Sequence, residues 1–189
     1  MNLFPTSYFP SISYFQAISY CQERAISGNE LFVKQSFRNR CEILTGNGIQ
    51  QLSIPIIKTD GSQSLTKDIQ IVPTKSWKKD HWGAIKNAYQ NAPYFEFFDR
   101  EIYNLIYTNQ KYLLDLNGEI INFILETFGL KKILLSDERL ELKTKLDYLN
   151  RINNSKKYIQ VFSDRFPFQS NLSVLDLIFC EGPMGRNLL

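Results

Sequence analysis

The sequence lacks the short motifs that usually announce an enzyme's chemistry. Its 189 residues include one histidine and three cysteines, and contain no HExxH, GxSxG or phosphate-loop pattern. One histidine and three unclustered cysteines cannot easily complete a zinc tetrahedron, so we expect no metal site and no bound cofactor. A carboxylate site for magnesium stays open, and the phosphates of a substrate could bring such an ion.

Three further absences bound the setting in which the protein works. Cys21, Cys41 and Cys180 are odd in number and lack CxxC spacing, which argues against a disulfide framework and favours a reducing compartment. No basic region precedes an apolar core in residues 1–10, and no apolar run approaches membrane-spanning length. The net charge of +3 is too small, and the lysines too dispersed, to indicate nucleic-acid binding. We therefore expect a cytoplasmic protein in which any anion site is local.

What is present indicates a well-packed globular core. Hydrophobic residues make up 43% of the chain and aromatic residues 14%, enough for one core and little more. The sequence TGNG at 45–48 separates two alternating runs, residues 30–42 and 49–57, and predicts a β-hairpin in which Pro55 marks an edge or a bulge. We expect a single α/β domain over residues 1–189, with a mixed sheet that contains this hairpin and is flanked by helices.

Helical spacing and end signals place the remaining elements. Asp115 or Asn117 is the expected cap of one helix, and Ser173 with Asp176 forms a capping-box-like pair that starts the last helix, before Gly182 ends it. The predicted helices start at Ser11 and cover 77–91, 95–107, 116–128 and 173–180; extended segments are predicted at 2–9, 69–72 and 158–162.

The run 30–42 is the first functional candidate. Read as a strand, it would bury one face and present a basic stripe on the other. The two guanidinium groups of Arg38 and Arg40 could bind a diphosphate or a carboxylate, with an amide contact from Asn39. The alternative is an ordinary exposed strand face, the usual environment of arginine. The odd-numbered residues on the face expected to be buried are Leu31, Val33, Phe37 and Cys41. The even-numbered residues on the basic face are Lys34, Arg38 and Arg40.

His81 is the second candidate, because it alone has an unperturbed pKa near neutrality and could act as a general base. On the predicted helix it neighbours Trp77 and Ile85, so a packed or capping role is the alternative. Tyr89, two turns further on, could share its face. Cys41 could carry an acyl group with His81 as the base, but its parity indicates a small buried hydrophobe.

Ser7, Tyr8 and Tyr14 flank the first junction between a strand and a helix. Backbone N–H groups at a helix N-terminus can meet phosphate or sugar hydroxyls, which makes these residues candidate ligand contacts. The alternative is packing, with Pro10 setting the helix entry angle and the aromatic rings filling the core.

Four segments of the chain carry a resemblance to a known family: SYFPSISYF at 7–15, KQSFRNRCEILTGNGIQQLSIPI at 34–56, HWGAIKNAYQNAPYFEFF at 81–98 and NLSVLDLIFCEGP at 171–183. In this order they resemble the WbqC-like protein family, and the RNR that precedes a hairpin and an LSIP strand is the most particular feature. The resemblance implies bacterial origin and a place in surface-polysaccharide or O-antigen biosynthesis, acting on sugar nucleotides or their lipid-linked products.

Two functions follow from the resemblance together with these candidates. The first is a transferase that adds an acyl or aminoacyl group to an amino sugar nucleotide. Arg38 and Arg40 would hold the diphosphate, and His81 would accept the amine proton. The second is a non-catalytic module that binds a sugar nucleotide or another anionic small molecule within a biosynthetic complex.

Overall fold

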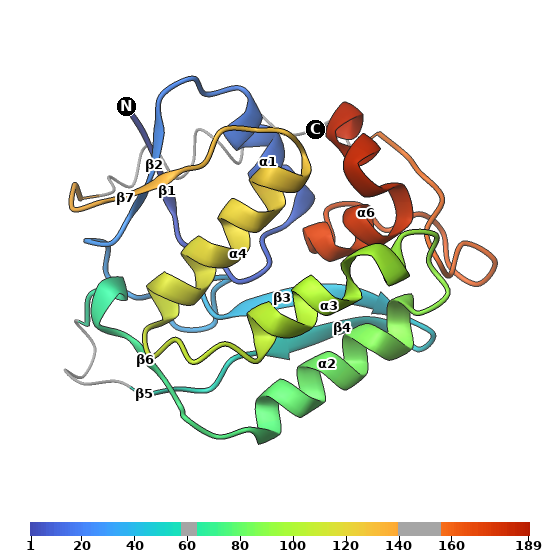
Figure 1. Ribbon diagram of the computed structural model, residues 1–189, viewed down its shortest axis with the longest axis horizontal. Helices are drawn as coiled ribbons and strands as arrows, with labels where there is room; N and C mark the ends of the chain where they lie inside the picture. The colour runs from blue at the N-terminus through green and yellow to red at the C-terminus, as the bar shows by residue number, and fades with distance from the viewer. Residues whose placement is uncertain (58–63, 140–155) are drawn as a thin grey trace.

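The computed structural model describes residues 1–57, 64–139 and 156–189. Its N-terminal part is a small parallel sheet in the order β1–β2–β7, formed by Asn2–Pro5, Arg24–Ser27 and Leu134–Ser136 (Figure 1). Helix α1 (Ile12–Ser19) connects β1 to β2 and begins directly after Ser11, as its sequence predicts. Helix α4 (Leu113–Thr127) lies against β7: a Cβ placed at Gly118 of the helix would be 3.7 Å from the side chain of Leu135.

The predicted hairpin is confirmed. β3 (Arg40–Thr45) pairs antiparallel with β4 (Gly48–Ser53), and Cys41 lies opposite Leu52. Both of these side chains are buried, so the alternation within the hairpin is real. After Pro55 the chain forms β5 (Ile56–Ile57), which pairs with β6 (Gln70–Ile71). Parallel and antiparallel strands thus occur in one α/β fold, distributed over three small sheets.

The helices follow the predicted order. Helices α2 (Ser76–Tyr89) and α3 (Phe95–Ile106) run antiparallel to each other; in Figure 1, α2 lies below the hairpin and α3 overlaps it. Helix α6 (Val174–Glu181) precedes a C-terminal 3₁₀ helix, η3 (Gly182–Leu188). The hydroxyl of Ser173 caps α6 by accepting from the N–H of Leu175, and Gly182 ends it with φ +58°. A short 3₁₀ helix, η2 (Thr66–Asp68), comes before β6.

Three local expectations are wrong. Helix α4 (Leu113–Thr127) begins after Tyr112, so Asp115 and Asn117 lie inside it and neither caps it. Residues 158–162 form no strand but lead into a turn. The side chain of Asp176 is not a capping group, because it accepts hydrogen bonds from the Tyr158 hydroxyl and the Gln160 amide.

The expected strand over residues 30–39 is also wrong, and the burial of most of its assigned side chains differs from the prediction, although Lys34 is exposed as expected. The chain turns between residues 34 and 38, where Gln35 has φ +55° and the Ser36 hydroxyl donates to the carbonyl of Val33. A turn breaks the two-residue alternation on which the prediction rested. Leu31, Val33 and Phe37 are consequently 44 to 52% exposed, whereas Arg38 is buried.

Candidate functional site

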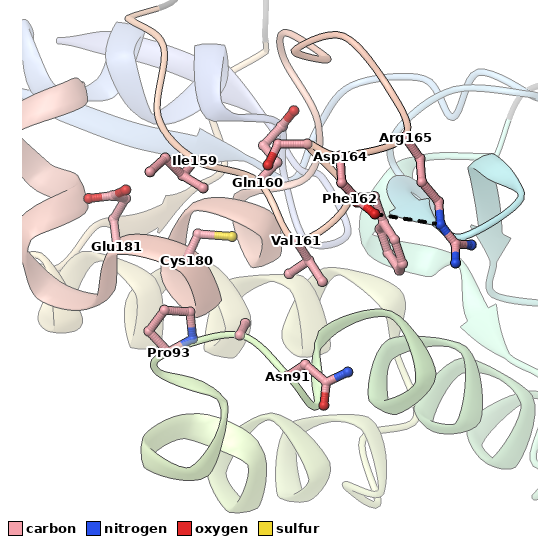
Figure 2. A pocket seen from close by; sticks show the side chains of 12 residues that line it. Asn91, Pro93, Ile159, Gln160, Val161, Phe162, Asp164, Arg165, Cys180 and Glu181 are labelled. Atoms are coloured by element: carbon pink, nitrogen blue, oxygen red, sulfur yellow. Dashed lines mark ion pairs between the residues drawn. The ribbon is translucent and has the colours of Figure 1, made fainter.

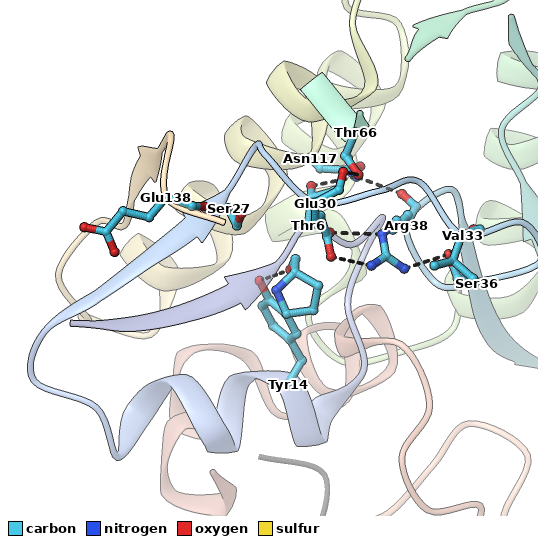
Figure 3. A network of polar contacts seen from close by, with 11 residues as sticks. Thr6, Tyr14, Ser27, Glu30, Val33, Ser36, Arg38, Thr66, Asn117 and Glu138 are labelled. Atoms are coloured by element: carbon cyan, nitrogen blue, oxygen red, sulfur yellow. Dashed lines mark hydrogen bonds and ion pairs between the residues drawn. The ribbon is translucent and has the colours of Figure 1, made fainter. Parts of the chain in front are cut away.

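Arg38 is held in the interior by a carboxylate. Its Nε donates to Oε1 of Glu30 at 2.9 Å, and its Nη2 donates to the other carboxylate oxygen, which completes a two-pronged ion pair. Only 5% of either side chain is exposed (Figure 3). Because Glu30 neutralises this guanidinium, Arg38 offers no free positive charge to a ligand in this arrangement.

The backbone around Arg38 is fixed by two asparagines. Asn117 of α4 donates from Nδ2 to the carbonyl of Arg38 at 2.8 Å and to the hydroxyl of Thr6 at 3.0 Å. Asn39 donates to the carbonyl of Ile54 at 2.9 Å. Arg40 opens β3 half-buried, and its Nε has no hydrogen-bond partner among the described residues. The RNR segment therefore ties the hairpin to α4 and to the end of β1.

His81 is buried in α2, with 4% of its surface exposed. Its Nδ1 and the hydroxyl of Tyr8 share a hydrogen bond of 3.0 Å, and Trp77 meets the ring edge-on. Desolvation by burial lowers the pKa of His81 to about 4, although a hydrogen bond to the backbone of Ser53 and the charge of Asp80 act in the opposite direction. The imidazole is therefore neutral at pH 7.

The candidates at the first junction and Cys41 are buried in the core or bound to backbone carbonyls. Tyr8 is fully buried, and burial raises the pKa of its hydroxyl. Burial likewise raises the pKa of the Cys41 thiol far above neutrality, so Cys41 is a protonated core residue. Ser7 donates to the carbonyl of Phe37 at 3.0 Å, and the hydroxyl of Tyr14 donates to the carbonyl of Pro5 at 2.8 Å.

Tyr89 belongs to a different cluster from His81. Its ring stacks on Phe179, and its pKa is raised by burial and by the nearby carboxylate of Asp176. The Oδ2 of Asp176 accepts from the Tyr158 hydroxyl at 2.5 Å and from the Gln160 amide at 2.9 Å. Burial raises the pKa of Asp176, although these donors oppose the rise. No cation pairs with this carboxylate in the part of the chain that the structure describes.

A cavity of about 550 Å³ lies beside this cluster, between residues 91–93 and 159–165 (Figure 2). Cys180 and Glu181 of α6 complete its lining. The Cys180 thiol is held protonated, because burial raises its pKa well above neutrality. Arg165 lies 3.9 Å from the carboxylate of Asp164, so the one basic side chain in the lining is already beside an acid. The lining of this cavity is more apolar than polar, and its charged side chains are two acids, Asp164 and Glu181, and one base, Arg165.

A second cavity, of about 360 Å³, lies where β6, the start of α2 and the end of α3 meet, and we call it the lysine pocket. Three lysines line it, Lys75, Lys78 and Lys111, and no acidic side chain of the described residues does so. Lys78 donates to the carbonyl of Thr108, and this hydrogen bond holds its ammonium group just beyond the C-terminal end of α3. None of the three forms an ion pair within residues 1–57, 64–139 and 156–189.

The N-terminus of α2 adds to this positive potential. Lys75 occupies the N-cap position, no side chain caps the helix, and its first turn contains no acid. The exposed N–H groups of a helix start carry partial positive charge, so cations are disfavoured there and anions are favoured. Burial and the neighbouring Lys75 lower the pKa of Lys78, as expected for cations held together without a counter-ion. The arrangement suits a bound anion.

None of the eight residues predicted from sequence lines either cavity. Tyr8 and His81 are hydrogen-bonded to each other, Arg38 pairs with Glu30, and Tyr89 lies beside Asp176. Ser7, Tyr14 and Asn39 bind backbone carbonyls. The first cavity is lined by residues 91–93, 159–165, 180 and 181, and the second by residues 57, 70–75, 78 and 108–111.

Comparison with known proteins settles the family. The model of the WbqC-like protein family matches residues 6–160, which is most of the chain. The chain belongs to the WbqC-like protein family. An uncharacterized protein of Mycobacterium tuberculosis is 29% identical over 91 residues, a match that covers 48% of this chain and 38% of that protein. The chain thus matches well under two thirds of this relative's length. No solved structure matches the chain.

The lysine pocket lies wholly within the part of this WbqC-like protein that matches the family, whereas residues 161–165, 180 and 181 of the larger cavity lie beyond it. In the described part of the chain, no three His, Cys, Asp or Glu side chains gather as metal ligands would. None of the described helices is both long enough and apolar enough to cross a membrane.

Sequence reasoning missed the pocket lysines, although part of the signal was visible. Lys75 and Lys78 flank the start of a predicted helix, where lysine is electrostatically unfavourable, and that pattern could have indicated an anion site. Lys111 gave no such signal, because only the fold brings it to the same pocket.

Proposed function

We propose that this WbqC-like protein binds a sugar nucleotide used in bacterial surface-polysaccharide or O-antigen biosynthesis, as a binding module of that pathway. The observation that supports this proposal is the lysine pocket. Lys75, Lys78 and Lys111 line one cavity beside the N-terminus of α2, and no acidic side chain of the described residues lines it. The family match supports the pathway, and the unpaired state of Cys21, Cys41 and Cys180 agrees with action in the cytoplasm.

The pocket fits the phosphate part of such a ligand. Its volume of about 360 Å³ lies at the small end of the range for ligand sites, roughly 300–1,000 Å³. Lysines bind phosphate as compact point charges, and the free N–H groups at the start of α2 can donate to phosphate oxygens. A diphosphate would relieve the repulsion among the three ammonium groups while receiving charge-assisted hydrogen bonds from them.

The acyl- or aminoacyltransferase prediction has weaker geometric support than binding. His81 is buried, shares Nδ1 with the Tyr8 hydroxyl, and has a pKa of about 4, whereas an efficient general base has a pKa near the working pH. Arg38 is neutralised by Glu30. The catalytic role of His81 and the diphosphate role of Arg38 therefore stay predictions, and the lysine pocket carries the proposal.

Direct titration tests the proposal. Wild-type protein and a Lys75→Gln/Lys111→Gln double variant are titrated calorimetrically with UDP- and dTDP-linked amino sugars at low and moderate salt. We expect the double variant to lose about tenfold or more in affinity, because each charge-assisted hydrogen bond contributes roughly 1.5–3 kcal/mol. Binding by the wild type should weaken as salt rises, since the lysines are close to solvent.

Lys79→Gln/Lys86→Gln is the matched control, because both lysines are exposed on α2 and neither lines the pocket. It removes the same net charge from the protein. We expect its affinity to stay within about twofold of the wild type. Equal losses in the two double variants, or no binding of any sugar nucleotide by the wild type, would refute the proposal.

A further inference from the structure

Three aromatic side chains form a strip on the surface of α2 and α3, and we call it the aromatic strip. The rings of Tyr103 and Tyr107 are stacked, with centroids 4.2 Å apart and planes inclined by 21°. The indole of Trp82 meets Tyr103 edge-on at 5.3 Å. Tyr103 is 38% exposed, and Trp82 and Tyr107 are partly exposed. Such rings are open to contact from solvent although their other sides pack against the core.

The strip adjoins the lysine pocket, although none of its three residues lines that cavity. Trp82 lies four residues, or about one helical turn, after Lys78 on α2, so the two side chains lie on the same face. Tyr107 directly precedes Thr108, which lines the pocket and accepts a hydrogen bond from Lys78. Figure 1 shows why these positions meet: α2 and α3 run antiparallel, so that the end of α3 lies beside the start of α2.

A pocket of cations next to open aromatic faces has the two chemistries that a nucleotide requires. Its phosphates need positive charge, and its base is a flat π-system that stacks on aromatic side chains. The hydrogen-bonding groups of the strip are the two tyrosine hydroxyls and the indole N–H, whereas stacking on the rings does not depend on which base is bound.

Resting on the proposed function, we infer that the aromatic strip binds the nucleobase of the ligand while its diphosphate occupies the lysine pocket. The ligand class is therefore a nucleoside diphosphate, and the attached sugar extends away from the strip. The site tolerates different bases, because stacking is not sequence-selective.

Three ligands separate the parts of this site: inorganic pyrophosphate, UDP, and glucosamine 1-phosphate, which has a sugar and a phosphate but no base. The wild type is expected to bind UDP at least tenfold more tightly than pyrophosphate. Tyr103→Leu keeps an apolar side chain on α3 but removes the ring. We expect it to weaken UDP binding about tenfold, in line with the loss of one stacked base, and to leave pyrophosphate binding unchanged.

Phe97→Leu is the control, because Phe97 is an aromatic residue with 71% exposure in the first turn of the same helix, at the end opposite to Tyr103. We expect UDP affinity to be unaffected by this change. Circular dichroism and thermal unfolding of both variants show whether each one is folded as the wild type.

The outcomes distinguish the inference from the proposed function. If pyrophosphate does not bind and Lys75→Gln/Lys111→Gln has no effect on any ligand, the lysine pocket itself fails. If pyrophosphate binds but UDP binds no more tightly, or Tyr103→Leu leaves UDP affinity unchanged, only the base-binding role is overturned. Equal sensitivity of UDP and glucosamine 1-phosphate to Tyr103→Leu also overturns it, since the strip would then bind the sugar.

Discussion

Acidification should destabilise this protein through His81. The folded state holds the imidazole neutral with a pKa of about 4, against an ordinary value of 6.5, because burial penalises the charged ring. Between these two pH values the unfolded chain binds a proton that the folded chain does not. The stabilisation is therefore complete above pH 6.5 and is lost as the pH falls towards 4.

The size of the effect follows from the two pKa values. The gap between 6.5 and about 4, at about 1.4 kcal/mol for each pKa unit, gives at most about 3.5 kcal/mol. Between pH 7.5 and pH 4.5 most of this, about 2.5 kcal/mol, should be lost. The loss corresponds to a fall of roughly 1 M in the urea midpoint, for an m-value near 2–3 kcal/mol/M.

Urea unfolding of the wild type and of His81→Gln at the two pH values isolates this contribution, because carboxylates titrate equally in both proteins. The wild type should lose about 2.5 kcal/mol more than the variant on acidification. Since the chain has one histidine, its ring proton resonances can also be assigned without ambiguity, and they should not shift between pH 7.5 and pH 5.5. Equal pH slopes, or a ring that titrates near 6.5, would refute the reasoning.

Three other perturbations test the structure. Glu30→Gln leaves Arg38 buried without a counter-charge and should cost about 3–5 kcal/mol in urea unfolding; a cost under 1 kcal/mol would contradict the buried pair. Gly182→Ala should lower the melting temperature, because φ at this position is +58° and a Cβ would lie 2.5 Å from the ring of Tyr94. Gly83→Ala in α2 is the matched change: its Cβ would meet nothing within 4 Å, and it should stabilise the protein by about 0.5–1 kcal/mol. The reverse order of these two melting temperatures would show the backbone account to be wrong. Burial raises the pKa of Asp176, so the unfolded chain loses this proton at a lower pH than the folded protein does. The stability of the wild type, measured relative to Asp176→Asn, should therefore fall as the pH rises above 4 through the folded pKa. Parallel stability curves of the two proteins would contradict this expectation.

Local signals predicted the elements that depend on neighbours in sequence. The hairpin followed from TGNG between two alternating runs, and α2 and α3 followed from helical spacing interrupted at Pro93. Gly182 and Ser173 marked the ends of α6 because capping and left-handed backbone are properties of single residues.

The parallel sheet could not be predicted in the same way. β2 and β7 have four and three residues, and β7 pairs with a strand more than 100 positions earlier in the chain. Strands this short carry no clear period, and their pairing is decided by the packing of α4 across them. Alternation misled over residues 31–39 because a turn centred near Gln35 changes which side chains point inward.

The candidate site shows the same division. Charge alone could not tell the arginine that pairs with a buried acid from a lysine that lines a pocket, since both are ordinary surface residues by type. Glu30 lies eight residues before Arg38, and only the turn between them brings carboxylate and guanidinium together. Lys111 joins Lys75 and Lys78 only because β6 and the end of α3 meet the start of α2.

The buried polar groups and the lysine pocket are nevertheless connected through α2. His81 attaches the middle of α2 to Tyr8 and to the backbone of Ser53 in β4, and the RNR segment fixes the hairpin to α4. The start of α2, which carries two of the pocket lysines, is therefore positioned by residues that touch no ligand there. Loss of Arg38 should weaken binding only to the extent that it lowers stability, whereas loss of Lys75 should weaken binding in a protein that unfolds at the wild-type temperature. That contrast separates a group that holds the fold from one that holds the ligand.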